Sequence, residues 1–183
     1  VSNGYSSNEF CEKDVKKETF PVLAGTVKYQ LNKENGILIL SGEGAIPDDV
    51  EYPFSVEKNK IKVIVVESEI ASIGSNAFKG FSSLQSLDIP DTVTGINKDA
   101  FADCSSLTSG TVGTILWDFD RITNEMFLGG SGVLKHDSTI FFAPWNLRLG
   151  DASSVFIGNT ITSIPDGMFS GLTHLKYVTL NAE

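Results

Sequence analysis

Two carboxylates with a spacing that could support chemistry lie in residues 114–120, which read Thr-Ile-Leu-Trp-Asp-Phe-Asp. Asp118 and Asp120 follow an apolar run and are separated by one residue. A β-strand would therefore point both carboxylates to the same side. Such a pair is either a catalytic arrangement or two solvated side chains on a surface strand.

An apolar strand followed by D-x-D is similar to the first motif of haloacid-dehalogenase-type phosphatases. That resemblance implies that one carboxylate attacks phosphorus and that the other handles the proton of the leaving group. Two observations oppose it: a related segment of the chain, described below, has Gln30 and Asn32 at the matching positions, and no alternation of strands and long helices follows. We expect two surface carboxylates, and a phosphatase using Asp118 and Asp120 is the least favoured alternative.

Other residues with chemical potential lack the spacing that their chemistry requires. The segments Gly42-Glu43-Gly44 and Gly130-Ser131-Gly132 have no third glycine and open no helix, so they predict bends and not a dinucleotide site. His136 and His174 have no partner at metal-ligand spacing. The sequence therefore predicts no catalytic residue, no cofactor and no metal.

The chain has two cysteines, Cys11 and Cys104. Two are too few for a disulfide framework or a zinc site. Cys104 occupies an apolar position of the repeat described next, which favours a buried thiol; a Cys11–Cys104 bridge is the alternative in an oxidising compartment.

An apolar frame recurs along the chain, and the other elements are arranged around it. Residues 70–90 return after a shift of 23 and again after a shift of 91, with the apolar positions preserved. The matching positions of the three copies are Ile70, Ile73, Ala77, Phe78, Phe81 and Leu84; Val93, Ile96, Ala100, Phe101, Cys104 and Leu107; and Ile161, Ile164, Met168, Phe169, Leu172 and Leu175. A repeat of this length is too short to bury its own apolar face, so it predicts stacked units.

The frame I-x-x-I-x-x-x-A-F-x-x-x-x-x-L-x-x-L-x-I-P resembles the BspA-like class of leucine-rich repeats over about residues 61–110 and 152–180. It departs from that class at Gly110, where a strand leucine is expected, and at Pro165, which replaces a glycine. The resemblance implies a solenoid in an exported or surface-attached protein, extracellular or on the cell surface, that takes part in adhesion. Phe78, Phe101 and Phe169 should form an aromatic ladder along it.

Period-two segments precede the repeats. Residues 27–31 alternate, a turn-forming stretch follows, and residues 37–40 are a second apolar run, which together predict a β-hairpin. An offset of 88 finds the same pattern from Gly113 to Gly132. The predicted fold is an α/β leucine-rich-repeat solenoid, mostly β, made of two tandem units that each have a hairpin followed by short repeat turns. Residues 1–24 form a polar N-terminal segment or cap, residues 25–112 the first unit, and residues 113–183 a second unit that is truncated or continues.

Composition limits the partners. The formal net charge of −9 opposes binding to nucleic acid or to an anionic membrane surface. No apolar run approaches the length that membrane insertion needs. We expect a protein or another extracellular macromolecule as the partner.

The outward row of the repeat strands is the predicted binding surface. It comprises Ser86 and Asp88 in the first unit, and Ser154, Phe156, Tyr177 and Thr179 in the second. We expect Phe156 and Tyr177 to lie side by side, facing outward as a recognition patch. In the alternative, residues 135–150, with Phe141, Phe142 and Trp145, fold over them and bury them. A second hypothesis is structural: the final strand leaves a bare edge, which predicts end-to-end self-association.

Overall fold

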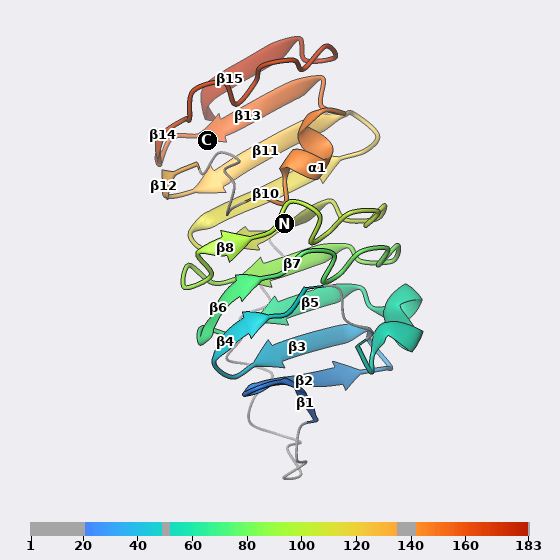
Figure 1. Cartoon of the computed structure of the whole chain (residues 1–183). Coiled ribbons are helices and arrows are strands. Elements are labelled where there is room, and N and C mark those ends of the chain that lie inside the picture. Colours follow the sequence, from blue (N-terminus) through green and yellow to red (C-terminus); the bar gives the residue numbers. More distant parts are fainter. Residues whose placement is uncertain (1–20, 49–51, 135–141, 183) are drawn as a thin grey trace.

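The computed structural model describes residues 21–48, 52–134 and 142–182 of the 183-residue chain. Short strands are stacked along one axis, from β1 at one end to β15 at the other (Figure 1). Ten of them form one sheet in the order β1-β2-β3-β5-β7-β9-β10-β11-β13-β15. Their bounds are Val22–Ala24 (β1), Val27–Asn32 (β2), Ile37–Ser41 (β3), Val63–Val66 (β5), Ser86–Ile89 (β7), Ser109–Val112 (β9), Ile115–Asp120 (β10), Glu125–Gly130 (β11), Ser154–Gly158 (β13) and Tyr177–Ala182 (β15).

Strand direction follows the two kinds of sequence pattern. The repeat strands β3, β5, β7 and β9 are parallel, as are β11, β13 and β15, because each coil of a solenoid returns the chain in the same direction. The hairpin strands β2–β3 and β10–β11 are antiparallel. The second hairpin joins the first unit through an antiparallel β9–β10 pair, so one sheet runs through both units without a break.

The opposite wall is built from shorter strands. Three parallel strands face the first part of the large sheet, and two more face the second part. The remaining elements are a short 3₁₀ helix and a one-turn α-helix. The strands of this wall are β4 (Gly44–Ile46), β6 (Ile70–Ile73), β8 (Gly95–Ile96), β12 (Gly132–Val133) and β14 (Ile161–Ser163). The 3₁₀ helix is η1 (Ser55–Lys60) and the α-helix is α1 (Asn146–Leu149). The predicted mostly-β solenoid of hairpins and repeat turns is confirmed.

The core lies between the two walls and is apolar along its length. Alternate strand residues such as Ile64, Leu87 and Val155 are buried, while their neighbours point outward. Within the core, the rings of Phe78 and Phe101 stack with centroids 5.4 Å apart and planes inclined by 16°. This pair matches the expected ladder. Phe169 is only partly buried and lies beyond the β10–β11 hairpin, which separates its coil from that of Phe101.

Glycines explain two local features of the sequence. Gly42 and Gly130 have φ of +92° and +88°, and a Cβ there would lie 2.2 Å and 1.9 Å from the carbonyl oxygens of Thr26 and Thr114. Only glycine fits these bends at the hairpin ends. At Gly110, a Cβ would lie 2.4 Å from the carbonyl oxygen of Leu87. The departure from the repeat frame at Gly110 therefore permits close approach of two neighbouring strands.

The boundaries at residues 24–25 and 112–113 remain a prediction, since the sheet is continuous across both of them. Most of the predicted N-terminal segment, residues 1–20, lies outside the described residues, as does Cys11. Cys104 is a buried free thiol, as its repeat position predicts. None of the helices that the structure describes is long and apolar enough to cross a membrane.

Candidate functional site

The outer face of the ten-stranded sheet carries the residues predicted as a binding surface. On β7 and β13 the burial pattern alternates, so Ser86, Asp88, Ser154 and Phe156 point away from the core. Ser154 and Phe156 adjoin Tyr177 and Thr179 on β15. Ser86 and Asp88 are separated from this group by β9, β10 and β11. The predicted residues therefore share one face but form two separate groups.

The register refines the predicted aromatic patch. Ser154 is the Cα partner of Tyr177, and Phe156 is the partner of Thr179. Phe156 and Tyr177 are thus diagonal neighbours on adjacent strands and are not directly opposite each other. Tyr177 is 68% exposed and Phe156 is half-buried. Both side chains remain accessible on the outer face.

Phe127 on β11 belongs to the same surface, although the sequence pattern did not identify it as a binding residue. It is the Cα partner of Phe156 on one side and of Asp118 on the other. Its ring lies over Gly129, where an added Cβ would come within 2.5 Å of Phe127 Cε1. Residues 126–128 are all apolar, so no alternation in the sequence marks Phe127 as outward-facing; the structure shows it half-buried between buried Met126 and Leu128. Phe127, Phe156 and Tyr177 together are called the aromatic patch below.

In the alternative interpretation, residues 135–150 cover this patch. The described part of that segment, residues 142–150, packs elsewhere. The Phe142 amide donates to the Ile96 carbonyl oxygen at 2.7 Å, on the opposite wall. The Trp145 side chain is buried in the core. Phe141 lies outside the described residues. Residues 142–150 therefore help to close the solenoid and leave Tyr177 exposed.

Asp118 and Asp120 point outward from β10, an antiparallel strand in the middle of the sheet. Burial, and secondarily the charge of Asp120, raises the pKa of Asp118. Asp120 Oδ1 accepts hydrogen bonds from the amides of Ile122 and Thr123 at 2.7 and 3.2 Å, which fixes the turn to β11. The phosphatase motif needs the crevice at the end of a parallel α/β sheet, and β10 is not in such a position.

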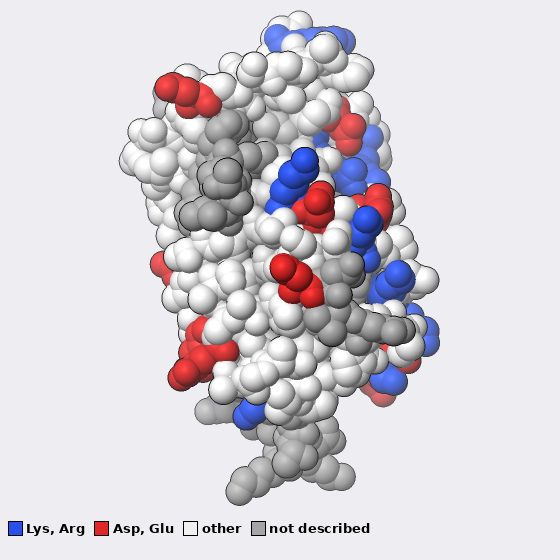
Figure 2. Space-filling model, in the orientation of Figure 1, with Lys and Arg blue, Asp and Glu red and all other residues white. Residues whose placement is uncertain are grey.

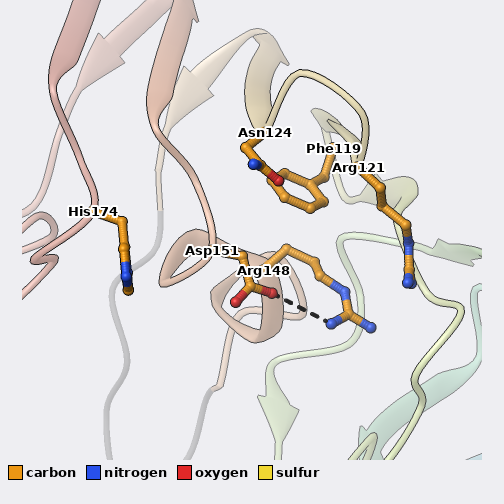
Figure 3. Close-up of a pocket in the computed structure, with 6 residues that line it drawn as sticks. All are labelled: Phe119, Arg121, Asn124, Arg148, Asp151 and His174. Atoms are coloured by element: carbon orange, nitrogen blue, oxygen red, sulfur yellow. Dashed lines mark ion pairs between the residues drawn. The ribbon is translucent and has the colours of Figure 1, made fainter.

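A pocket of about 340 Å³ lies beside α1, on the loop side of the stack (Figure 3). It is lined by Phe119, Arg121, Asn124, Arg148, Asp151 and His174. Burial, and to a lesser degree the positive charge of Arg121, lowers the pKa of Arg148. In Figure 3 the Asp151 carboxylate lies between the Arg148 and His174 side chains. His136, the other histidine, lies outside the described residues.

The arginines of this pocket are already engaged by the fold. Arg148 Nε donates to the Leu107 carbonyl oxygen at 2.8 Å, and its Nη2 donates to those of Cys104 and Ser105 at 3.0 and 2.7 Å. Its Nη1 lies 3.6 Å from Asp151 Oδ2. Arg121 also donates to the Ser105 carbonyl oxygen. These contacts attach the second unit to the last coil of the first, so we assign them a structural role.

Comparison with known proteins places the chain in a family. The model of the BspA type leucine rich repeat region matches residues 51–135 and 148–183, in six copies. The chain belongs to this family of BspA-type leucine-rich repeats, whose members are typically recognition modules and not enzymes. No curated protein matches the chain.

A solved structure of a leucine-rich repeat protein shares the fold. A protein from Eubacterium ventriosum is 22% identical with a TM-score of 0.54, over 87% of this chain and 43% of that one. A T. pallidum protein is 18% identical with a TM-score of 0.44, over 85% and 80% of the two chains. A Bacteroides ovatus protein is 20% identical with a TM-score of 0.35, over 88% and 42%. The chain thus spans less than half the length of the E. ventriosum protein.

Proposed function

We propose that this protein binds another macromolecule, most simply a protein, through the outer face of its large sheet. The observation that carries the proposal is the aromatic patch: three aromatic side chains lie on adjacent strands of the outer sheet face and are accessible among the described residues. Exposed aromatics supply much of the binding energy at protein interfaces, because they bury a large area with few rotatable bonds. A solenoid offers such an extended surface and no deep catalytic cleft.

Adhesion at the cell surface or outside the cell is the finer form of this proposal. It is supported by the family to which the chain belongs, because the resemblance of the sequence to that family implies an exported, surface-attached protein. The acidic composition is consistent with a protein partner and opposes nucleic acid.

Capture of partners from matrix and cell-surface proteins tests the proposal. The Phe156→Ser, Tyr177→Ser double variant should lose most of the captured protein, because it removes two of the three aromatic side chains. A matched control is Val56→Ser with Ile122→Ser, which removes two apolar side chains that are 86% and 94% exposed but lie off the sheet face. Equal capture by the parent and the patch variant would refute the proposed surface.

A second candidate function is self-assembly through β15. The inward residues of this strand are open to solvent: Val178 is 41% and Leu180 55% exposed, whereas the equivalent Leu87 and Ile89 are 1% and 0% exposed. An edge strand with exposed backbone and apolar side chains is suited to pair with another strand. Light scattering over a range of concentrations should show growth in mass that Val178→Lys with Leu180→Lys abolishes. A parent protein that stays monomeric at high concentration would exclude this function.

A further inference from the structure

The outer face of the sheet has a marked charge bias. From β3 to β15, the outward-pointing strand residues include four carboxylates, on Asp88, Asp118, Asp120 and Glu125, and neither lysine nor arginine. On the loop side, by contrast, Glu57 contacts both Lys33 and Lys60, and in Figure 2 basic and acidic side chains are interspersed on the face shown. From β3 to β15 the outer face therefore has a negative potential that these strands do not compensate; Lys28 lies on β2, outside this range.

The carboxylates adjoin the aromatic patch. In one row across the strands, Asp118 is the Cα partner of Phe127, which is the partner of Phe156. In the next row, Asp120 is the partner of Glu125, which is the partner of Ser154, followed by Tyr177. Each row thus contains at least one carboxylate and at least one aromatic side chain.

The arrangement of the carboxylates has an energetic cost. Asp120 and Glu125 are like charges on directly paired strand positions, an arrangement that destabilises a sheet. Asp118 lies two residues from Asp120 on the same side of β10, and its pKa is raised by its burial and by that neighbour. A cation placed between these groups would relieve the repulsion. A ligand that supplies one gains more here than on a surface with mixed charges.

We propose that the outer face over β10, β11 and β13 binds a cationic, lysine- or arginine-bearing segment of the partner protein. The cationic groups lie on Asp118, Asp120 and Glu125, while their alkyl stems or guanidinium planes rest on Phe127 and Phe156. This inference rests on the proposed function and adds the chemistry of the partner. It also gives the D-x-D sequence of β10 a role in recognition in place of phosphoryl transfer.

Peptide titrations followed by NMR test the partner's chemistry. The probes are three peptides of equal length in which the same spaced positions carry lysine, glutamine or glutamate among leucine, glycine and serine. With the lysine peptide, amide shift changes should appear at Asp118, Phe127 and Phe156, and binding should weaken as salt is raised. The glutamate peptide should give no shift changes on this face.

Charge-neutralising variants locate the effect. Asp118→Asn with Asp120→Asn should weaken lysine-peptide binding about three- to tenfold and flatten its salt dependence, because exposed ion pairs each contribute modestly. The control Glu43→Gln with Asp99→Asn makes the same change in net charge at exposed sites off this face and should change binding less than about twofold. Cooperative thermal unfolding by circular dichroism, with no fall in melting temperature, verifies that both variants fold.

The outcomes separate this inference from the proposed function. Three outcomes would each overturn the proposal of a cationic partner segment. They are equal binding of the lysine and glutamine peptides, no shift changes on the face with the lysine peptide, and equal effects of the two double variants. Displacement of the lysine peptide by Ca²⁺ that the neutralised variant resists would also overturn it, in favour of a metal site. The proposed function is judged separately, by whether capture still depends on Phe156 and Tyr177.

Discussion

Two coils of this solenoid have nearly the same sequence frame and very different environments. In residues 70–89 the frame residues Ile70, Ile73, Phe78 and Leu84 are at most 1% exposed. Their equivalents in residues 161–180 are only partly buried: Ile161, Ile164, Phe169 and Leu175. The two sets are identical in residue type. Burial here is therefore set by the neighbours of a coil and not by its own sequence.

The neighbours differ because of the strand order. β7 of the first coil has β5 on one side and β9 on the other, whereas β15 in the described structure has only β13 beside it. Each coil of a solenoid contributes one interface to each neighbour, so a coil with one neighbour loses about half of its stabilising contacts. Identical substitutions in the two coils should therefore cause very different losses of unfolding free energy.

Phe78→Ala and Phe169→Ala are the most direct test of the comparison. Phe78 is fully buried and stacks on Phe101, so its truncation should cost about 3–5 kcal/mol of unfolding free energy. Phe169→Ala should cost less than half as much, because solvent already reaches part of its ring. Urea unfolding followed by circular dichroism measures both.

Leu84→Ala and Leu175→Ala repeat the test at a second pair of identical residues and control for effects peculiar to aromatic rings. Leu84 is 0% exposed and Leu175 is partly buried. Equal losses of stability within both pairs would show that the terminal coil is as well supported as the internal one, and the comparison would fail.

Arg148→Met should have the next largest effect, because it opens the junction between the two units. The substitution removes the donors to the carbonyl oxygens of Cys104, Ser105 and Leu107. We expect a loss of about 2–3 kcal/mol, since charged hydrogen bonds contribute more than neutral ones. The carbonyl oxygens of Cys104 and Ser105 keep the Leu107 amide and Arg121 as donors, whereas that of Leu107 loses its Arg148 donor. Arg121→Met removes a contact to Ser105 alone and should cost less. A larger fall in melting temperature for Arg121→Met than for Arg148→Met would contradict this assignment.

Much of the fold could be predicted from the sequence because the signals are local and repeated. The 23-residue frame identifies which residues face the core, and alternation identifies the strands; Leu87, Phe101 and Val155 are all buried as expected. The two hairpins were also recognisable from alternation and glycine. These features depend on spacing within a coil, which a single chain displays directly.

The candidate site was only partly predictable because it depends on register between elements. Phe127 became part of the aromatic patch only when β11 paired in parallel with β13, a pairing that no spacing in the sequence specifies. The same pairing separates Ser86 and Asp88 from the second group of predicted residues. The exposure of Val178 likewise depends on the absence of a neighbouring strand among the described residues, and its sequence position resembles that of Leu87.

Cys104 offers a chemical test of the buried internal coil. Burial raises the pKa of its thiol to about 12, and its Sγ lies 3.2 Å from the Phe78 carbonyl oxygen, to which it donates. We expect Cys104 to resist iodoacetamide at neutral pH in the folded protein and to react once urea unfolds it, because the thiolate is the nucleophile. Peptide mapping after alkylation distinguishes it from Cys11. Rapid labelling of Cys104 without denaturant would mean that the coil opens readily.

The smallest expected effect concerns Asp118 in the second hairpin, which occupies the position that Gln30 holds in the first. Because the pKa of Asp118 is raised by folding, the folded state holds its proton more tightly than the unfolded state does, and stability falls as pH rises through that pKa. Asp118→Gln, which copies the first hairpin, should therefore be slightly more stable than the parent at neutral pH. The difference should vanish as pH falls below the ordinary aspartate value of 3.8. Melting temperatures of the two proteins across this range measure it, and a variant that gains stability on acidification relative to the parent would show that the sign is wrong.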